Sequence, residues 1–136
     1  MFVLDTNVVS ELRRPEKADR KVLAWASLTP LASIFLSVIT LLELELGALS
    51  IARKDEAQGR VLRSWIDDQI LPRFEGRMLA IDAAVALRCA SLHVPDPRAE
   101  RDALIAATAL VHGMTIVTRN VAFFERTGVQ ILNPWS

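Results

Sequence analysis

Three carboxylates in this 136-residue chain lie on apolar segments, where folding alone gives little reason for a charge. Asp5 ends the run 2–4, Glu43 interrupts the run 38–44, and Asp102 opens the run 103–107. An acid on an apolar segment is costly unless it is paired, hydrogen-bonded or bound to a cation. If the three converge, they form an all-oxygen pocket of the kind that holds Mg²⁺ or Mn²⁺. We therefore predict a divalent-metal site built from carboxylates.

Each of these acids also has a possible structural role. Asp5 can cap a helix that starts near Asn7. The segment Thr40-Leu41-Leu42-Glu43 matches the capping-box pattern S/T-x-x-E, which would place Glu43 at the third helical position. Asp102 can be a first-turn acid that the helix dipole favours. We favour a shared site because all three acids fall at strand ends or helix starts on one predicted edge of the sheet. Gathered there without a cation, they would repel and raise one another's pKa values, and a divalent ion removes that cost.

The other reactive residue types indicate no second reaction centre. The chain contains no His-x-x-x-His pair, which argues against zinc, and no glycine-rich nucleotide loop or nucleophile elbow. Cys89 lies on an apolar helical segment and is expected in the core. His93 and His112 fall near predicted helix ends, where we expect them to interact with the helix dipole rather than with a metal.

Composition narrows the class of protein. Half of the residues are hydrophobic, which is ample for a core in one domain covering residues 1–136. The single cysteine excludes an intrachain disulfide and fits a cytoplasmic setting. No signal peptide is recognised, and the longest apolar stretch is too short to span a bilayer, so no membrane association is expected. A net charge of zero gives no sign of nucleic-acid binding, although residues 13–21 are locally basic.

Short apolar segments alternate with helical patterns along the chain. The expected strands are 2–4, 34–37, 78–81, 115–118 and 129–132, and the expected helices are 7–14, 17–28, 40–53, 55–70, 82–92 and 100–112. This alternation predicts an α/β fold whose parallel sheet is covered on both faces. Ligands of such sheets gather at the carboxyl ends of the strands. Asp5 follows the first strand and Asn120 follows the fourth, so the acids can share one edge.

Four blocks of the chain resemble the signature of the PIN-domain family. They are Leu4-Asp5-Thr6-Asn7, residues 36–47, residues 102–109 and Thr118-Arg119-Asn120. The closing Asn133-Pro134-Trp135 resembles the FitB-like branch of the VapC toxins. The resemblance implies a three-layer α/β/α PIN fold with a parallel sheet of about five short strands.

The resemblance also implies a function. It indicates a Mg²⁺- or Mn²⁺-dependent endoribonuclease that hydrolyses RNA phosphodiesters with a metal-activated water and acts as the toxin of a type II toxin–antitoxin pair. Asp5, Glu43 and Asp102 match the metal-binding acids, and Asn120 matches a fourth catalytic position that is often Asp. Asn7 and Thr118 match polar positions around the site. The implied partners are RNA, a VapB-type antitoxin and a second copy of the chain, with operator DNA reached only through the antitoxin.

Two other functions remain open. Because Asn120 replaces a fourth acid, the chain can be a catalytically degenerate PIN domain that mainly binds an antitoxin in operon autoregulation. A haloacid-dehalogenase-like phosphatase also begins with a strand that ends in Asp. Its chemistry needs a second Asp two residues later, where this chain has Asn7.

Overall fold

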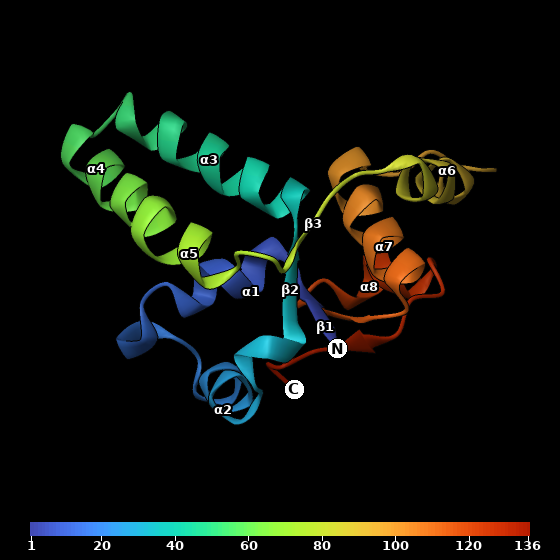
Figure 1. Ribbon diagram of the computed structural model, residues 1–136, viewed down its shortest axis with the longest axis horizontal. Coiled ribbons are helices and arrows are strands. Elements are labelled where there is room, and N and C mark those ends of the chain that lie inside the picture. The colour runs from blue at the N-terminus through green and yellow to red at the C-terminus, as the bar shows by residue number, and fades with distance from the viewer.

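A parallel sheet of five short strands forms the centre of the fold (Figure 1). The computed structural model describes residues 1–136. The strands are β1 (Phe2–Leu4), β2 (Ile34–Ser37), β3 (Met78–Leu79), β4 (Thr115–Val117) and β5 (Ile131–Leu132). Their order across the sheet is β3-β2-β1-β4-β5, and every neighbouring pair is parallel. All five predicted strands are present, although β3 and β5 are two residues shorter than expected.

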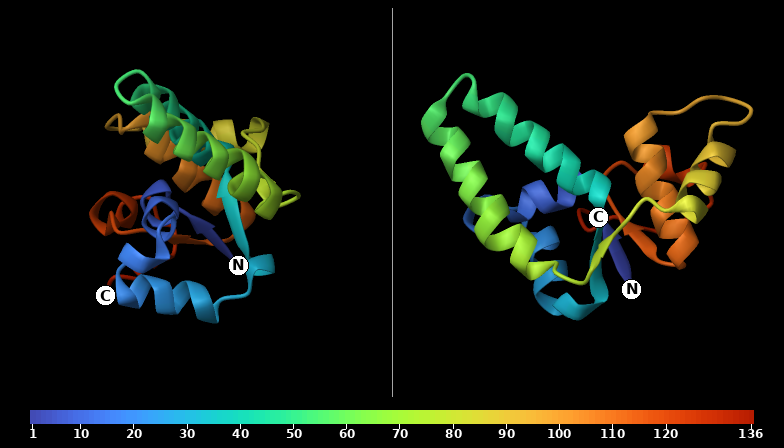
Figure 2. Two further views of the ribbon diagram at one scale, coloured as in Figure 1. Left: turned by 90° about the vertical axis from the view of Figure 1, so that its left-hand side faces the viewer. Right: turned by 45° about the horizontal axis from the view of Figure 1, so that its top comes forward.

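Helices cover both faces of the sheet, which gives the predicted three layers (Figures 1 and 2). The core on one face contains side chains of α1 (Thr6–Leu12), α2 (Arg20–Leu28), α3 (Val38–Ala52), α4 (Glu56–Trp65) and the π-helical turn η3 (Ile66–Ile70). The short helix α5 (Leu71–Arg73) follows η3 directly. The other face packs against α7 (Glu100–His112) and α8 (Val121–Glu125), with α6 (Ala83–Leu92) on the outer side of α7. Two 3₁₀ turns, η1 (Pro15–Lys17) and η2 (Leu31–Ser33), flank α2.

The central strand β1 shows why these strands are apolar at every position. Leu4 belongs to the core on the α1 side, and Phe2 packs against the same core. Val3 belongs to the core on the α7 side. Successive side chains of a strand point to opposite faces. In a strand covered on both faces no side chain points to solvent, so every position is apolar.

The α3–α4 hairpin extends beyond the sheet as a pair of closely packed helices (Figures 1 and 2). The two helices approach closely at Gly59, which is buried, and a Cβ placed there would lie 2.5 Å from the Cβ of Ala52. Glu45 and Arg63 join the two helices by two hydrogen bonds of 2.6 Å. None of the helices in this fold is long and apolar enough to cross a membrane.

The helix ends test the capping predictions. Asp5 caps α1, the structural role that its sequence position allowed. Asp82 caps α6, and Gly113 ends α7 in the left-handed conformation. The capping box at Thr40 is wrong, because α3 already begins at Val38 and the Ser37 hydroxyl accepts the cap bond from the Ile39 N–H at 3.0 Å. Glu43 therefore lies in the second turn of α3, where the helix start gives no reason for an acid. The helix α8 was not predicted.

Candidate active site

The strand order places a topological switch point between β1 and β4. The chain leaves β1 toward β2 on one side and later returns to β4 on the other, with Leu4 paired to Val117. In open parallel sheets, ligands bind in the crevice at such a point, beyond the carboxyl ends of the strands. Asp5 directly follows β1 and Thr118 directly follows β4. The fold thus brings residues from the two ends of the chain to the position where a ligand is expected.

Asp5 is the most buried acid of this region, with only 5% of its surface exposed. Its Oδ1 accepts a hydrogen bond of 2.8 Å from the Thr6 backbone N–H, which is the cap bond of α1. Its Oδ2 accepts from the Thr118 hydroxyl at 2.8 Å and from the Asn7 side-chain amide at 3.2 Å. The capping role and a site role are therefore compatible in one side chain. The hydrogen bonds fix its orientation at the edge of the sheet.

Glu43 is held beside Asp5 by Thr6. The Thr6 hydroxyl donates to Glu43 Oε1 at 2.7 Å, while the backbone N–H of the same residue donates to Asp5. The Thr6 oxygen also lies 3.1 Å from the hydroxyl of the buried Thr40. On the other side of the carboxylate, Arg101 Nη1 lies 3.7 Å from Glu43 Oε2. One threonine of α1 thus links the acid after β1 to the acid of α3.

Asp102 lies in the first turn of α7, next to Arg101. Burial raises its pKa above the usual range, the charge of Glu43 raises it further, and Arg101 opposes the shift. The pKa of Asp5 is also raised, chiefly by burial and then by the charges of Asp102 and Glu43, against the hydrogen bonds from Thr118 and Thr6. Asp5 is therefore close enough to both other acids for their charges to raise its pKa, and Asp102 is close enough to Glu43.

This donor set fits a hydrated divalent cation. Three carboxylates meet with one arginine at the rim, so the region carries excess negative charge that a cation would offset. Ligand atoms of the three acids do not all lie within 4.8 Å of one another. An ion held here would keep part of its water shell, which is the way Mg²⁺ is usually held in proteins.

The polar residues after β4 lie around Asp5 to different degrees. The Thr118 hydroxyl bonds Asp5 directly and also accepts the Asn120 backbone N–H at 2.9 Å. Asn7 bonds Asp5 and lies 3.4 Å from both the Thr118 hydroxyl and the Arg119 backbone N–H. The Asn120 side chain begins α8, is exposed and makes no hydrogen bond to the acids. The structure thus places Asn120 at the edge of the site rather than inside it.

Comparison with known proteins identifies the family. A family model described as PIN domain matches residues 2–129. The chain belongs to the PIN-domain family. This PIN domain is 36% identical over 140 residues to the VapC ribonuclease Y4jK of Sinorhizobium fredii, with 99% of the chain and 98% of the relative covered. It is 39% identical over 141 residues to the toxin FitB of Neisseria gonorrhoeae, with 99% of each covered.

A solved structure of FitAB bound to a DNA fragment has the same fold as this PIN domain. The TM-score is 0.89 at 36% sequence identity, and the match covers 100% of this chain and 96% of the other. The expected three-layer α/β/α fold is confirmed by this likeness and by the sheet itself.

Two residues of the PIN-domain site gained no role from the sequence alone. Thr6 was part of a recognised block, yet its contact with Glu43 joins residues 37 positions apart, and no local pattern signals such a contact. Arg101 precedes Asp102 on a predicted helix, and only the packing of α7 against α3 brings its charge to Glu43. Both contacts are products of the sheet topology.

Proposed function

We propose that this PIN domain is a Mg²⁺- or Mn²⁺-dependent endoribonuclease that acts as the toxin of a type II toxin–antitoxin pair. The observation that carries the proposal is the gathering of Asp5, Glu43 and Asp102 at the switch point of the sheet, with raised pKa values at Asp5 and Asp102. The names of the relatives, a VapC ribonuclease and a toxin, support the same activity.

The residues of the site divide the work of hydrolysis. When bound, the divalent ion supplies an activated water at neutral pH and offsets charge on the phosphate oxygens. Asp5, Glu43 and Asp102 would hold this ion. Thr118 and Thr6 donate to Asp5 and favour its ionised form, which is the form that binds a cation.

The rim of the site is suited to the RNA backbone. The Arg101 guanidinium lies beside the acids with part of its surface open to solvent, where a phosphate oxygen can accept its N–H groups. We propose that the exposed Asn120 amide contacts the scissile phosphate. In-line attack leaves a 5′-phosphate and a 3′-hydroxyl. Single-stranded or loop RNA is the substrate we expect, because the bases of a duplex are hidden from side chains.

The proposal includes the partners of a toxin–antitoxin system. We propose that the chain forms a homodimer and binds a VapB-type antitoxin, which in turn contacts operator DNA. The solved structure of FitAB on a DNA fragment supports this assembly, because one chain of that structure matches nearly the whole of this one.

The experiment is cleavage of single-stranded RNA by purified Asp5→Asn protein. The rate should fall on the order of 10²-fold or more, the scale of removing one key electrostatic contact from an active site. Asp82→Asn is the matched control, because Asp82 is also a helix-capping aspartate but lies outside the site. Chelation by EDTA should stop the wild-type reaction and added Mg²⁺ or Mn²⁺ should restore it. Wild-type cleavage by Asp5→Asn would refute the assignment.

A degenerate PIN domain that only binds an antitoxin is the second candidate. It is favoured by the neutral, exposed Asn120 at the position of a fourth acid. Wild-type protein that binds an antitoxin but cleaves no RNA with either metal ion would establish it. The phosphatase alternative has lost its basis, because the chain is a PIN domain and Asn7 donates to Asp5 instead of supplying a second acid.

A further inference from the structure

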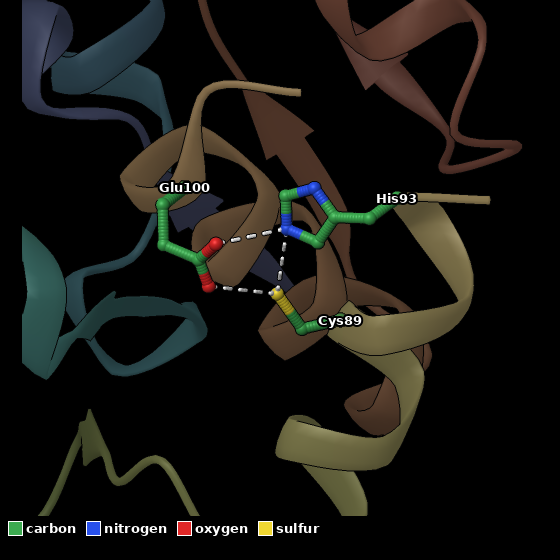
Figure 3. Close-up of side chains that lie close together, drawn as sticks. All are labelled: Cys89, His93 and Glu100. Carbon is green, nitrogen blue, oxygen red and sulfur yellow. Dashed lines mark hydrogen bonds and ion pairs between the residues drawn. The ribbon is translucent and has the colours of Figure 1, made fainter. Parts of the chain in front are cut away.

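A second group of metal-ligand side chains lies where α6 meets α7, outside the carboxylate site (Figure 3). Cys89 and His93 are one helical turn apart at the end of α6, and Glu100 opens α7. His93 Nε2 lies 3.0 Å from Glu100 Oε2 and 3.8 Å from Cys89 Sγ. Cys89 Sγ lies 3.7 Å from Glu100 Oε1. One ligand atom from each residue lies within 4.8 Å of the other two, and no other group of three or more His, Cys, Asp and Glu residues in the chain gathers so closely.

The arrangement does not suit a nucleophilic cysteine. In a catalytic triad the base uses one ring nitrogen for the nucleophile and the other for the orienting acid. Here the thiol and the carboxylate both face Nε2 of His93, and Nδ1 accepts the Arg98 backbone N–H at 3.0 Å. No proton can be relayed from sulfur through the ring to the acid. Convergence on one point is instead the geometry of a cation site.

The spacing of the sulfur and the ring nitrogen matches a tetrahedral ion. Metal–donor lengths of about 2.3 Å for thiolate sulfur and about 2.0–2.1 Å for imidazole nitrogen require a sulfur–nitrogen separation of about 3.6 Å. The same lengths require about 3.6 Å between sulfur and a carboxylate oxygen and about 3.3 Å between nitrogen and oxygen. The observed sulfur–nitrogen separation is 3.8 Å, close to the required value. The sulfur contacts Glu100 Oε1 at 3.7 Å, whereas the ring nitrogen contacts Glu100 Oε2 at 3.0 Å. The Glu100 carboxylate must therefore rotate to present one oxygen to the ion.

We propose that Cys89, His93 and Glu100 bind a borderline divalent cation of the Zn²⁺ type, with a water in the fourth position. Thiolate and imidazole ligands select Zn²⁺ over Mg²⁺, so this site and the all-oxygen site take different ions. A His-x-x-x-His pair, the pattern of many zinc sites, is absent from the chain. The present signal is Cys89-x-x-x-His93, and it is completed by a residue seven positions further along the chain.

The surroundings give an ion both a wall and an entrance. Cys89 is 3% exposed and packs among Val85, Ala103 and Ala107, an apolar shell that limits solvent access to the sulfur. The Glu100 side chain is 67% exposed and that of His93 is 21% exposed, so the ion enters from the Glu100 side. The third ligand can swing outward to admit it. An inner wall and an open side are both required of a site that exchanges its metal.

Binding changes the protons of two ligands. The Cys89 thiol proton passes to solvent, because the thiolate is the ligand form. The ion also takes the place of the ring proton on Nε2 of His93, which now resides on Nδ1. Nδ1 can then no longer accept from the Arg98 N–H, so that hydrogen bond of the α6–α7 connection must be exchanged for another. An occupied site thus joins the end of α6 to the start of α7 with a changed connection between them.

Cobalt binding to the full-length, tag-free, reduced protein tests the proposal, with excess Mg²⁺ present to fill the carboxylate site. We expect one Co²⁺ per chain, with the intense visible bands of a tetrahedral ion and a thiolate-to-cobalt absorption that only Cys89 can provide. Zn²⁺ should displace the Co²⁺. No part of this readout depends on ribonuclease activity, so failure of either proposal leaves the other intact.

Variants identify the ligands. Cys89→Ser should abolish the thiolate absorption. His93→Gln and Glu100→Gln should each weaken binding at least about tenfold, since changes merely adjacent to metal ligands already cost that much. His112→Gln is the control, because the other histidine is exposed at the far end of α7. His93 and Glu100 are partly exposed, so their variants remain informative if Cys89→Ser fails to fold. The proposal would be overturned if the wild type lacked the thiolate absorption. It would also be overturned if His93→Gln and Glu100→Gln both bound Co²⁺ as tightly as the wild type.

Discussion

Thr118 is a buried hydroxyl whose removal tests the architecture of the carboxylate site. Its side chain is fully buried, and it donates the 2.8 Å hydrogen bond to Asp5 Oδ2. Thr118→Val keeps the shape but removes this bond and leaves the Asn120 backbone N–H without its acceptor. A hydrogen bond to a charged group contributes about 1.5–3 kcal/mol to the free energy of unfolding. We therefore expect Thr118→Val to lower the free energy of unfolding by about 1.5–3 kcal/mol at neutral pH.

The pH dependence follows from the direction of the pKa shift. Thr118 opposes the rise that burial imposes on the pKa of Asp5, so the pKa rises further in Thr118→Val. The variant shows its full loss of unfolding free energy, relative to the wild type, at pH values above the pKa of its own Asp5. At those pH values the carboxylate is charged in both proteins. As the pH falls through that pKa, Asp5 takes up a proton in the variant before it does so in the wild type. The difference in unfolding free energy between the two proteins then becomes smaller.

The assay is urea unfolding in EDTA at a series of pH values, with RNA cleavage measured in Mg²⁺ over the same range. Thr118→Ser should restore both stability and activity, because it restores the hydroxyl. Thr108→Val is the matched control, since Thr108 is equally buried but its hydroxyl only bonds the Leu104 carbonyl of its own helix. That control should lose less than about 1 kcal/mol. Equal stability of Thr118→Val and wild type at neutral pH would refute the reasoning.

Three further outcomes can be measured. Asp102→Asn should raise the melting temperature of the metal-free protein at neutral pH but not at acidic pH, because burial and Glu43 raise the pKa of Asp102 and its charged form is the costly one. Mg²⁺ or Mn²⁺ at 100 times its dissociation constant should stabilise the wild type by about 2.7 kcal/mol; a melting temperature insensitive to both ions would contradict the metal site. Gly59→Ala should lower the free energy of unfolding by about 1–3 kcal/mol, because the added methyl group would collide with Ala52. Gly47→Ala meets nothing within 4 Å and should raise the free energy of unfolding by up to about 1 kcal/mol. Equal effects of the two variants in chemical denaturation would count against the close packing of α3 and α4.

Strands buried on both faces were predictable because their pattern is local. The range of β2, Ile34–Ser37, agrees fully with the expectation, and so does the end of α7 at Gly113. In both cases the structure is determined by neighbouring residues. For β2 it is a continuous apolar run, and for the end of α7 it is a glycine that readily adopts the left-handed conformation.

The start of α3 shows where local patterns fail. Ser37 and Thr40 both match a helix cap, and tertiary contacts decide between them. The Thr40 hydroxyl is buried beside Thr6, while that of Ser37 is free to accept from Ile39. The short α8 was missed because five residues show too little periodicity to be recognised.

The candidate site was predictable in its residue types and edge but not in its contacts. Asp5 and Asp102 drew attention because acids on apolar segments need an explanation. The link from Thr6 to Glu43, and the gathering of Cys89 with Glu100, depend on how distant segments pack. Such contacts have no signal within a short window of sequence.

The hydrogen bond from Thr118 to Asp5 joins positions 113 residues apart, and β1 lies between β2 and β4 in the sheet. During synthesis the first strand emerges from the ribosome long before the strand that completes its environment. A nascent chain that ends before residue 102 has Asp5 without Asp102 and Thr118, so the proposed carboxylate site is incomplete in it. The proposed site therefore forms only after almost the whole chain has been translated.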